Sequence, residues 1–193
     1  MNIADNDRVQ FVDIEPRAKY TPNKCAYNAK DEAETVGGEV VFGRAIFLWD
    51  KVMFDLIGHA VVEKDRRYYC VTPSKMGDQK VLFVPDPSIR FDFDNPNSRL
   101  PSCEVAISKK PEVQKLLNVR EDIRNIKIKY PVSSNGVLLS PADAQALSVL
   151  ERQQTDLLSR VIYALHPLKA KCACGSAKQF KKCCRPHMQR VYG

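Results

Sequence analysis

"TPNKCAYNAKDEAETVGGEV", residues 21–40, combines a helix signal with the start of an apolar run, and this combination sets the fold class. Thr21 or Asn23 is expected to cap the helix, and Gly37-Gly38 is expected to end it. The Val-, Ile-, Phe- and Tyr-rich runs that follow predict strands of a mostly antiparallel sheet. These runs are EVVFGRAIFLW (39–49), MFDLIGHAVVE (53–63), RRYYCVTP (66–73) and KVLFVP (80–85). The predicted class is α+β, with a helix followed by a mostly antiparallel sheet.

For the second half of the chain, the sequence predicts a loop, a helix, a turn and a second helix. Residues 86–103 are polar and Pro-rich, which predicts a loop, and residues 111–126 have a helical pattern. VSSNG, residues 132–136, predicts a turn or short linker. An amphipathic helix is expected from Ser140, where a Ser-Pro-x-Asp start favours capping, to the His166-Pro167 pair. The expected divisions are a core domain at 1–135, a linker and helix at 136–167, and a small module at 168–193.

Composition is that of an ordinary soluble protein, with 44% hydrophobic and 27% charged residues among 193. The start is polar and acidic, unlike a secretory signal peptide. The most apolar stretch, VVFGRAIFLW, has ten residues and contains Arg44, so it is too short to span a bilayer. A cytoplasmic protein is therefore expected.

Charge is unevenly distributed along the chain. Residues 157–193 hold eight of the 30 Lys and Arg residues and none of the 23 Asp and Glu residues, so the net charge of +7 arises in this tail. Such asymmetry predicts an acidic partner, such as an acidic protein, a ribosome, nucleic acid or anionic lipid. A solvated basic end that only aids solubility is the alternative.

Four of the seven cysteines lie within the stretch KCACGSAKQFKKCC, residues 171–184. Disulfides are disfavoured in a cytosolic chain, and adjacent cysteines bridge each other poorly. Buried structural thiols would need apolar neighbours, whereas these neighbours are Lys, Ser, Gln and Gly. A closed tetrahedral Zn²⁺ site with four thiolate ligands fits the spacing best. The predicted ligands are Cys172, Cys174, Cys183 and Cys184.

The same residues resemble the SEC-C motif, C-x-C-G-S-G-x-x-[FY]-[KR]-x-C-[CH], which ends the bacterial translocation ATPase SecA and many small bacterial proteins. The likeness covers about 15 residues, and Ala177 replaces the usual second glycine. It implies a zinc module that binds a protein or ribosome and has no catalytic role.

A second candidate site is the pair Cys25 and His59. Cys25 falls in the first turn of the predicted helix, where the helix dipole stabilises a thiolate, and His59 lies on a predicted strand. This order is typical of papain-like and transglutaminase-like thiol enzymes. The competing interpretation is that both are packing residues, since no oxyanion donor is identified and Cys103 is incidental.

The stretch from Cys25 to Pro73 is also similar to an uncharacterised bacterial family that often carries SEC-C tails. The residues that carry the likeness are Cys25, Asn28, Gly37, Gly38, Gly43, Trp49, His59, Ala60, Val61, Val71, Thr72 and Pro73. Cys70 stands where that pattern has Asp, so Asn28, Thr72 or a distant Asp would have to orient the imidazole. Two functions are therefore expected in competition: a zinc-binding recruitment module, or a thiol hydrolase or acyltransferase that uses the module for targeting.

Overall fold

The computed structural model describes residues 9–131 and 138–193, so the predicted VSSNG turn lies outside the described residues. The chain forms two compact units. The first comprises residues up to Leu48 together with Phe54–Val105, and the second comprises Trp49–Met53 together with Ala106–Gly193. Each unit has its own hydrophobic core.

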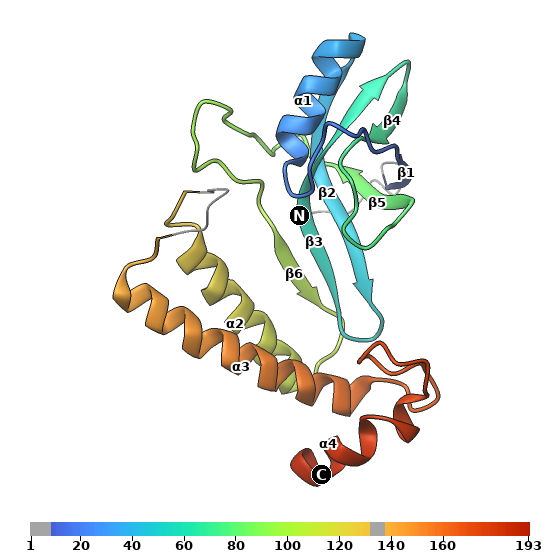
Figure 1. The fold of residues 1–193 in the computed structure, drawn as a ribbon, viewed down its shortest axis with the longest axis vertical. Coiled ribbons are helices and arrows are strands. Elements are labelled where there is room, and N and C mark those ends of the chain that lie inside the picture. The colour runs from blue at the N-terminus through green and yellow to red at the C-terminus, as the bar shows by residue number, and fades with distance from the viewer. Residues whose placement is uncertain (1–8, 132–137) are drawn as a thin grey trace. The chain divides into compact units, whose positions relative to one another are not determined.

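The first unit is built on a closed ring of five strands with a sixth strand added to it (Figure 1). The strands are β1 (Gln10–Ile14), β2 (Glu39–Trp49), β3 (Met53–Lys64), β4 (Arg67–Cys70), β5 (Lys80–Pro85) and β6 (Cys103–Ala106). Their order is β2-β5-β1-β4-β3, a further pairing of β2 with β3 closes the ring, and β6 pairs with β3. The α+β prediction is confirmed, but the sheet is a barrel, which the sequence analysis did not predict.

The sheet is also not purely antiparallel, because β1 runs parallel to β4 and antiparallel to β5. The register pairs Val12 with Val81 and Gln10 with Phe83. The interior is filled by one buried cluster, to which β1, β2, β3, β4 and β5 all contribute. Its members are Val12, Ala45, Val61, Cys70, Val81 and Phe83.

Helix α1 (Cys25–Val36) covers a second buried cluster on the other face of the sheet. Three alanines on one side of the helix pack there against Ala60 and Val62 of β3 and against Tyr69 of β4. The helix ends as predicted at Gly37, which adopts a left-handed φ of 70°. The predicted amino-terminal cap is wrong: Lys24 occupies the cap position and no side chain caps the helix. Asn23 instead turns the chain with a φ of 66°.

The loop between β5 and β6 follows the predicted loop closely, except that Cys103 already belongs to β6. Two aromatic residues of this loop pack against helix α1. Phe91 and Phe93 each make an edge-to-face contact with Tyr27 of α1, at ring-centroid separations of 5.5 and 5.7 Å. The loop is therefore held by packing although it lacks regular structure.

The second unit is helical. Helices α2 (Pro111–Lys127) and α3 (Pro141–Leu165) lie side by side, and α4 (Arg185–Tyr192) follows near the end of the chain (Figure 1). Ser140 caps α3 as predicted, because its hydroxyl accepts a hydrogen bond of 3.1 Å from the amide of Asp143. The core of this unit comprises Val52, Met53, Val113, Leu116, Leu117 and Val161. Helix α2 thus lies in the second unit, although it falls within the predicted core domain at 1–135.

Candidate functional site

The four predicted metal ligands meet in space. The Sγ atoms of Cys172, Cys174, Cys183 and Cys184 all lie within 4.8 Å of one another. Sγ of Cys183 is 3.6 Å from that of Cys174 and 3.9 Å from that of Cys184. A tetrahedral ion with metal–sulfur bonds of about 2.3 Å separates its sulfur ligands by about 3.8 Å. The cluster therefore has a size that can hold a metal ion.

A short hairpin brings the two cysteine pairs together. Lys171 and Gln179 form an antiparallel bridge, and the amide of Cys172 donates to the carbonyl of Lys178 over 2.9 Å. Gly175 turns the chain with a φ of 84°, and its amide donates to the Cys172 carbonyl at 3.1 Å. No atom lies within 4 Å of a Cβ built on Gly175, so glycine is needed there for its backbone conformation.

Phe180 anchors this hairpin. Its side chain is fully buried and meets the ring of His166 edge-to-face, with centroids 5.0 Å apart. Nε2 of His166 in turn donates to the carbonyl of Lys171 at 2.8 Å. The end of α3 therefore supports the cysteine loop directly. The sequence contained Phe180 within the motif, but nothing in it indicated that His166 would be the partner.

The thiols of the cluster perturb one another strongly. Hydrogen bonds from Ser176 lower the pKa of Cys174 to about 6. Hydrogen bonding with the neighbouring thiols, above all Cys172, raises the pKa of Cys184 to about 12. Four clustered thiols cannot all ionise unaided, because each thiolate disfavours the next. A bound cation removes this obstacle, so the donor set fits a metal ion.

The two members of the predicted catalytic pair, Cys25 and His59, have different immediate neighbours in the structure. Cys25 packs against the cluster under α1, whereas the ring of His59 lies beside Phe83 of the barrel interior, with centroids 6.3 Å apart. Nε2 of His59 is 3.2 Å from Sγ of Cys70. Among the described residues no hydrogen bond joins Cys25 to His59. Cys70 is thus the residue that contacts the imidazole of His59.

The other candidates for orienting the imidazole have different partners. Nδ2 of Asn28 donates to Oγ1 of Thr72 at 3.0 Å and to the carbonyl of Thr21 at 2.9 Å. The hydrogen bond between these two side chains thereby links the start of α1 to the segment that follows β4. Cys103, which was expected to be incidental, receives a contact of 3.7 Å from Nη1 of Arg44.

Burial determines the protonation states of Cys25, Cys70 and His59. It raises the pKa of Cys25, raises that of Cys70 to about 11, and lowers that of His59 to about 4. The sequence predicted a stabilised thiolate at Cys25 because of the helix amino terminus. Loss of hydration outweighs that effect, so thiol and imidazole are both neutral near pH 7.

Thiol labelling tests this assignment. In metal-loaded protein, Cys25 and Cys70 are expected to react with iodoacetamide at pH 7 at least about tenfold more slowly than an unfolded cysteine peptide, because the thiolate is the nucleophile. The rates should rise toward high pH, where these thiols ionise. His59→Ala should leave the Cys25 rate unchanged. Rapid labelling of Cys25 at pH 6 that His59→Ala slows, as read by peptide mass spectrometry, would restore the thiol-enzyme hypothesis.

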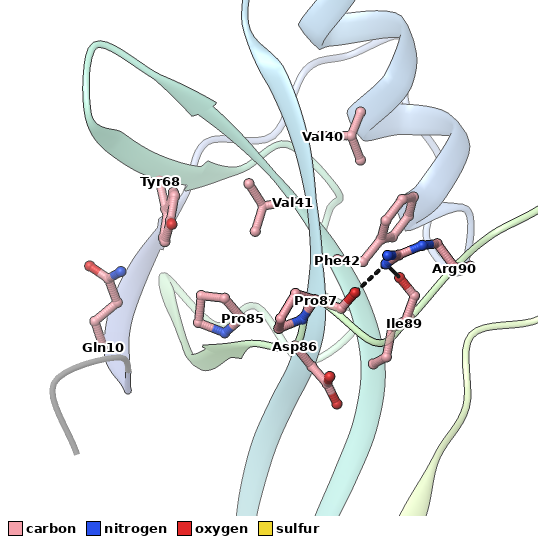
Figure 2. A pocket seen from close by; sticks show the side chains of 10 residues that line it. All are labelled: Gln10, Val40, Val41, Phe42, Tyr68, Pro85, Asp86, Pro87, Ile89 and Arg90. Atoms are coloured by element: carbon pink, nitrogen blue, oxygen red, sulfur yellow. Dashed lines mark hydrogen bonds between the residues drawn. The ribbon is translucent and has the colours of Figure 1, made fainter. Parts of the chain in front are cut away.

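An open groove of about 580 Å³ lies on the first unit (Figure 2). Residues of β2 (Val40, Val41 and Phe42) line it together with the chain that follows β5. Arg90 is turned back toward its own loop, where Nη1 contacts the carbonyls of Pro87 and Ile89. None of the predicted site residues lines this groove, and its charged groups are engaged in holding the loop.

No protein-family model, no curated protein and no solved structure matches the chain. Within residues 9–131 and 138–193, no helix has the combination of length and apolar character that crossing a membrane requires.

Proposed function

We propose that the protein is a cytoplasmic zinc-binding protein whose carboxy-terminal module recruits an acidic partner. The observation that carries this proposal is the convergence of four cysteine Sγ atoms within 4.8 Å. Four thiolates in tetrahedral spacing favour Zn²⁺ or an iron–sulfur centre over hard cations. The resemblance of residues 172–184 to the SEC-C motif supports zinc. The ligands would be Cys172, Cys174, Cys183 and Cys184.

The zinc would have a structural role. Four protein ligands leave no open coordination position for water or substrate, which is the arrangement of structural zinc sites. The hairpin has one fully buried aromatic side chain, Phe180, and is too small to fold by burial of apolar surface alone. Metal binding and folding of the module are therefore one event. The bound metal would hold the module rigid and so keep its basic residues in fixed positions on the surface.

The alternative function, a papain-like or transglutaminase-like thiol hydrolase or acyltransferase that uses Cys25 and His59, has less support. The nearest thiol to the imidazole is that of Cys70, which is 1% exposed, and burial keeps both Cys25 and Cys70 protonated. A recruitment module requires no such reactive thiol.

Metal analysis tests the proposal. Purified protein is expected to contain about one Zn²⁺ per chain, and Co²⁺ substitution is expected to produce the thiolate charge-transfer bands of a tetrahedral sulfur site. The Cys183→Ser, Cys184→Ser double variant should lose the metal, because it removes two of four ligands. Cys25→Ser, Cys103→Ser is the matched control and should keep it. Full metal content in the first variant, or iron in place of zinc, would contradict the assignment.

A further inference from the structure

We infer that the acidic partner of the module is the phosphate backbone of a nucleic-acid duplex. This inference rests on the proposed function, since it concerns the surface that the metal would hold in place. The lysines that would make the contacts are Lys169, Lys171, Lys178, Lys181 and Lys182. All five are exposed.

Backbone hydrogen bonds in the hairpin join the two segments that carry these lysines. The Lys181 amide donates to the carbonyl of Leu168 at 3.0 Å, and the amide of Phe180 donates to that of Ala170 at 2.9 Å. The bridge between Lys171 and Gln179 extends the same pairing toward the metal site. Lysines separated by up to 13 positions in the chain are thus brought onto two paired segments.

Among residues 9–131 and 138–193, these lysines have no carboxylate partners. In the described part of the chain none of the five forms an ion pair, whereas Lys127 pairs with Glu151 and Lys129 with Asp143 elsewhere in the same unit. A divalent ion with four thiolates has a formal charge of about −2, which offsets only part of the lysine charge. The remaining positive charge is held together on the surface, and a polyanion would neutralise it.

The surface has the composition of a phosphate-binding site and lacks that of a protein interface. Cores of protein interfaces are depleted in lysine and rely on buried aromatic anchors. Here Phe180 is fully buried, and Leu168 and Val191 are the only large hydrophobic side chains that the described residues 166–193 expose. Lysine contacts to phosphate oxygens require no apolar anchor, and they fix position without reading sequence.

The aromatic and arginine side chains of the module favour a duplex over a single strand as the ligand. Single strands are bound by stacking of bases on exposed aromatic rings or arginine planes. The Tyr192 ring packs against Tyr163 at 6.1 Å, and the guanidinium of Arg185 lies over the Tyr163 ring at 3.7 Å. These groups are engaged between α3 and α4. A duplex instead offers dense phosphate charge, about one per 1.7 Å of axis.

The test measures binding of the full zinc-loaded chain to fluorescent 20-base-pair DNA and RNA duplexes of mixed sequence. With five lysine contacts, affinity is expected to fall about 500-fold between 50 and 200 mM salt, because counterions are released from the duplex. Lys178→Gln, Lys181→Gln, Lys182→Gln should weaken binding and reduce the slope of log K against log salt by about 2.7. Lys75→Gln, Lys109→Gln, Lys115→Gln removes the same charge from exposed lysines outside the module, which form no ion pair with any described residue, and should retain the slope.

Binding of two competitors and a zinc measurement distinguish failure of this inference from failure of the proposed function. Competing poly-glutamate and a single strand of the same length are expected to bind at least about tenfold more weakly than either duplex. Zinc is measured on every sample. If zinc is present and poly-glutamate binds as well as the duplex, or if both triple variants lose affinity equally, the duplex inference is overturned while the zinc module stands. If zinc is absent from the wild-type protein, the proposed function itself fails.

Discussion

If the protein binds zinc as proposed, removal of the metal is expected to release helix α4 from helix α3. Helix α4 has eight residues and no buried side chain, so it is too short to persist alone in water. Its first residue, Arg185, directly follows the proposed ligand Cys184 and contacts the ring and carbonyl of Tyr163. Its last residue, Tyr192, donates to Asp156 at 3.2 Å. Structural zinc contributes about 10–16 kcal/mol to folding of comparable peptides, so chelation should unfold the whole module.

Hydrogen exchange provides the measurement. The amide of Met188, which donates to the carbonyl of Cys184 at 3.0 Å, should lose at least about 100-fold of its protection when a strong chelator is added. Amides within α2 and the first half of α3 should keep theirs, because their core around Val113 and Leu116 lies outside the module. The Cys183→Ser, Cys184→Ser variant should already show the released state, with no further change on chelation. Continued protection of Met188 in the chelated protein would show that α4 docks without metal.

Gly43→Ala is expected to strain the barrel and to reduce the free energy of unfolding of the first unit by roughly 3 kcal/mol. A Cβ on Gly43 would lie 2.2 Å from the carbonyl oxygen of Val84 and 2.5 Å from Cζ of Phe83. The first atom belongs to the backbone of the paired strand β5, and the second to a side chain that is fully buried. The Val84 carbonyl cannot move away without separating β2 from β5, and the Phe83 ring is enclosed in the buried cluster of the barrel interior.

Gly37→Ala is the matched control for this change. No atom lies within 4 Å of a Cβ at Gly37, so only its left-handed φ of 70° opposes the substitution, at about 1–2 kcal/mol. Urea denaturation followed by circular dichroism compares the two variants. Equal midpoints for the two, or an unchanged midpoint for Gly43→Ala, would show that β2 and β5 are not packed as closely as the structure has them.

Local patterns predicted much of the secondary structure. Strand β2 spans the predicted residues 39–49, β5 spans 80–85, and α3 begins after the predicted cap Ser140. Each signal lies within the element itself, as apolar β-rich runs or as a cap next to a proline. Strand β1 was not predicted, because QFVDI is short and follows a polar, acidic segment. It forms a strand by pairing with β4 and β5, which lie more than 50 residues away in the chain.

The two candidate sites differ in the same way. Residues that are close in the sequence form the cysteine cluster, whereas strands that are distant in the sequence surround His59. The four cysteines lie within 13 positions and a glycine turn joins them, so the sequence by itself determined which thiols the structure brings together. Only the tertiary structure decided the surroundings of His59, because its neighbours come from β4 and β5 through the register of a closed barrel. That register places Cys70 at the imidazole and buries both groups, and burial sets their charge through loss of hydration. A sequence records which thiols are adjacent, but desolvation depends on how distant strands pack around them.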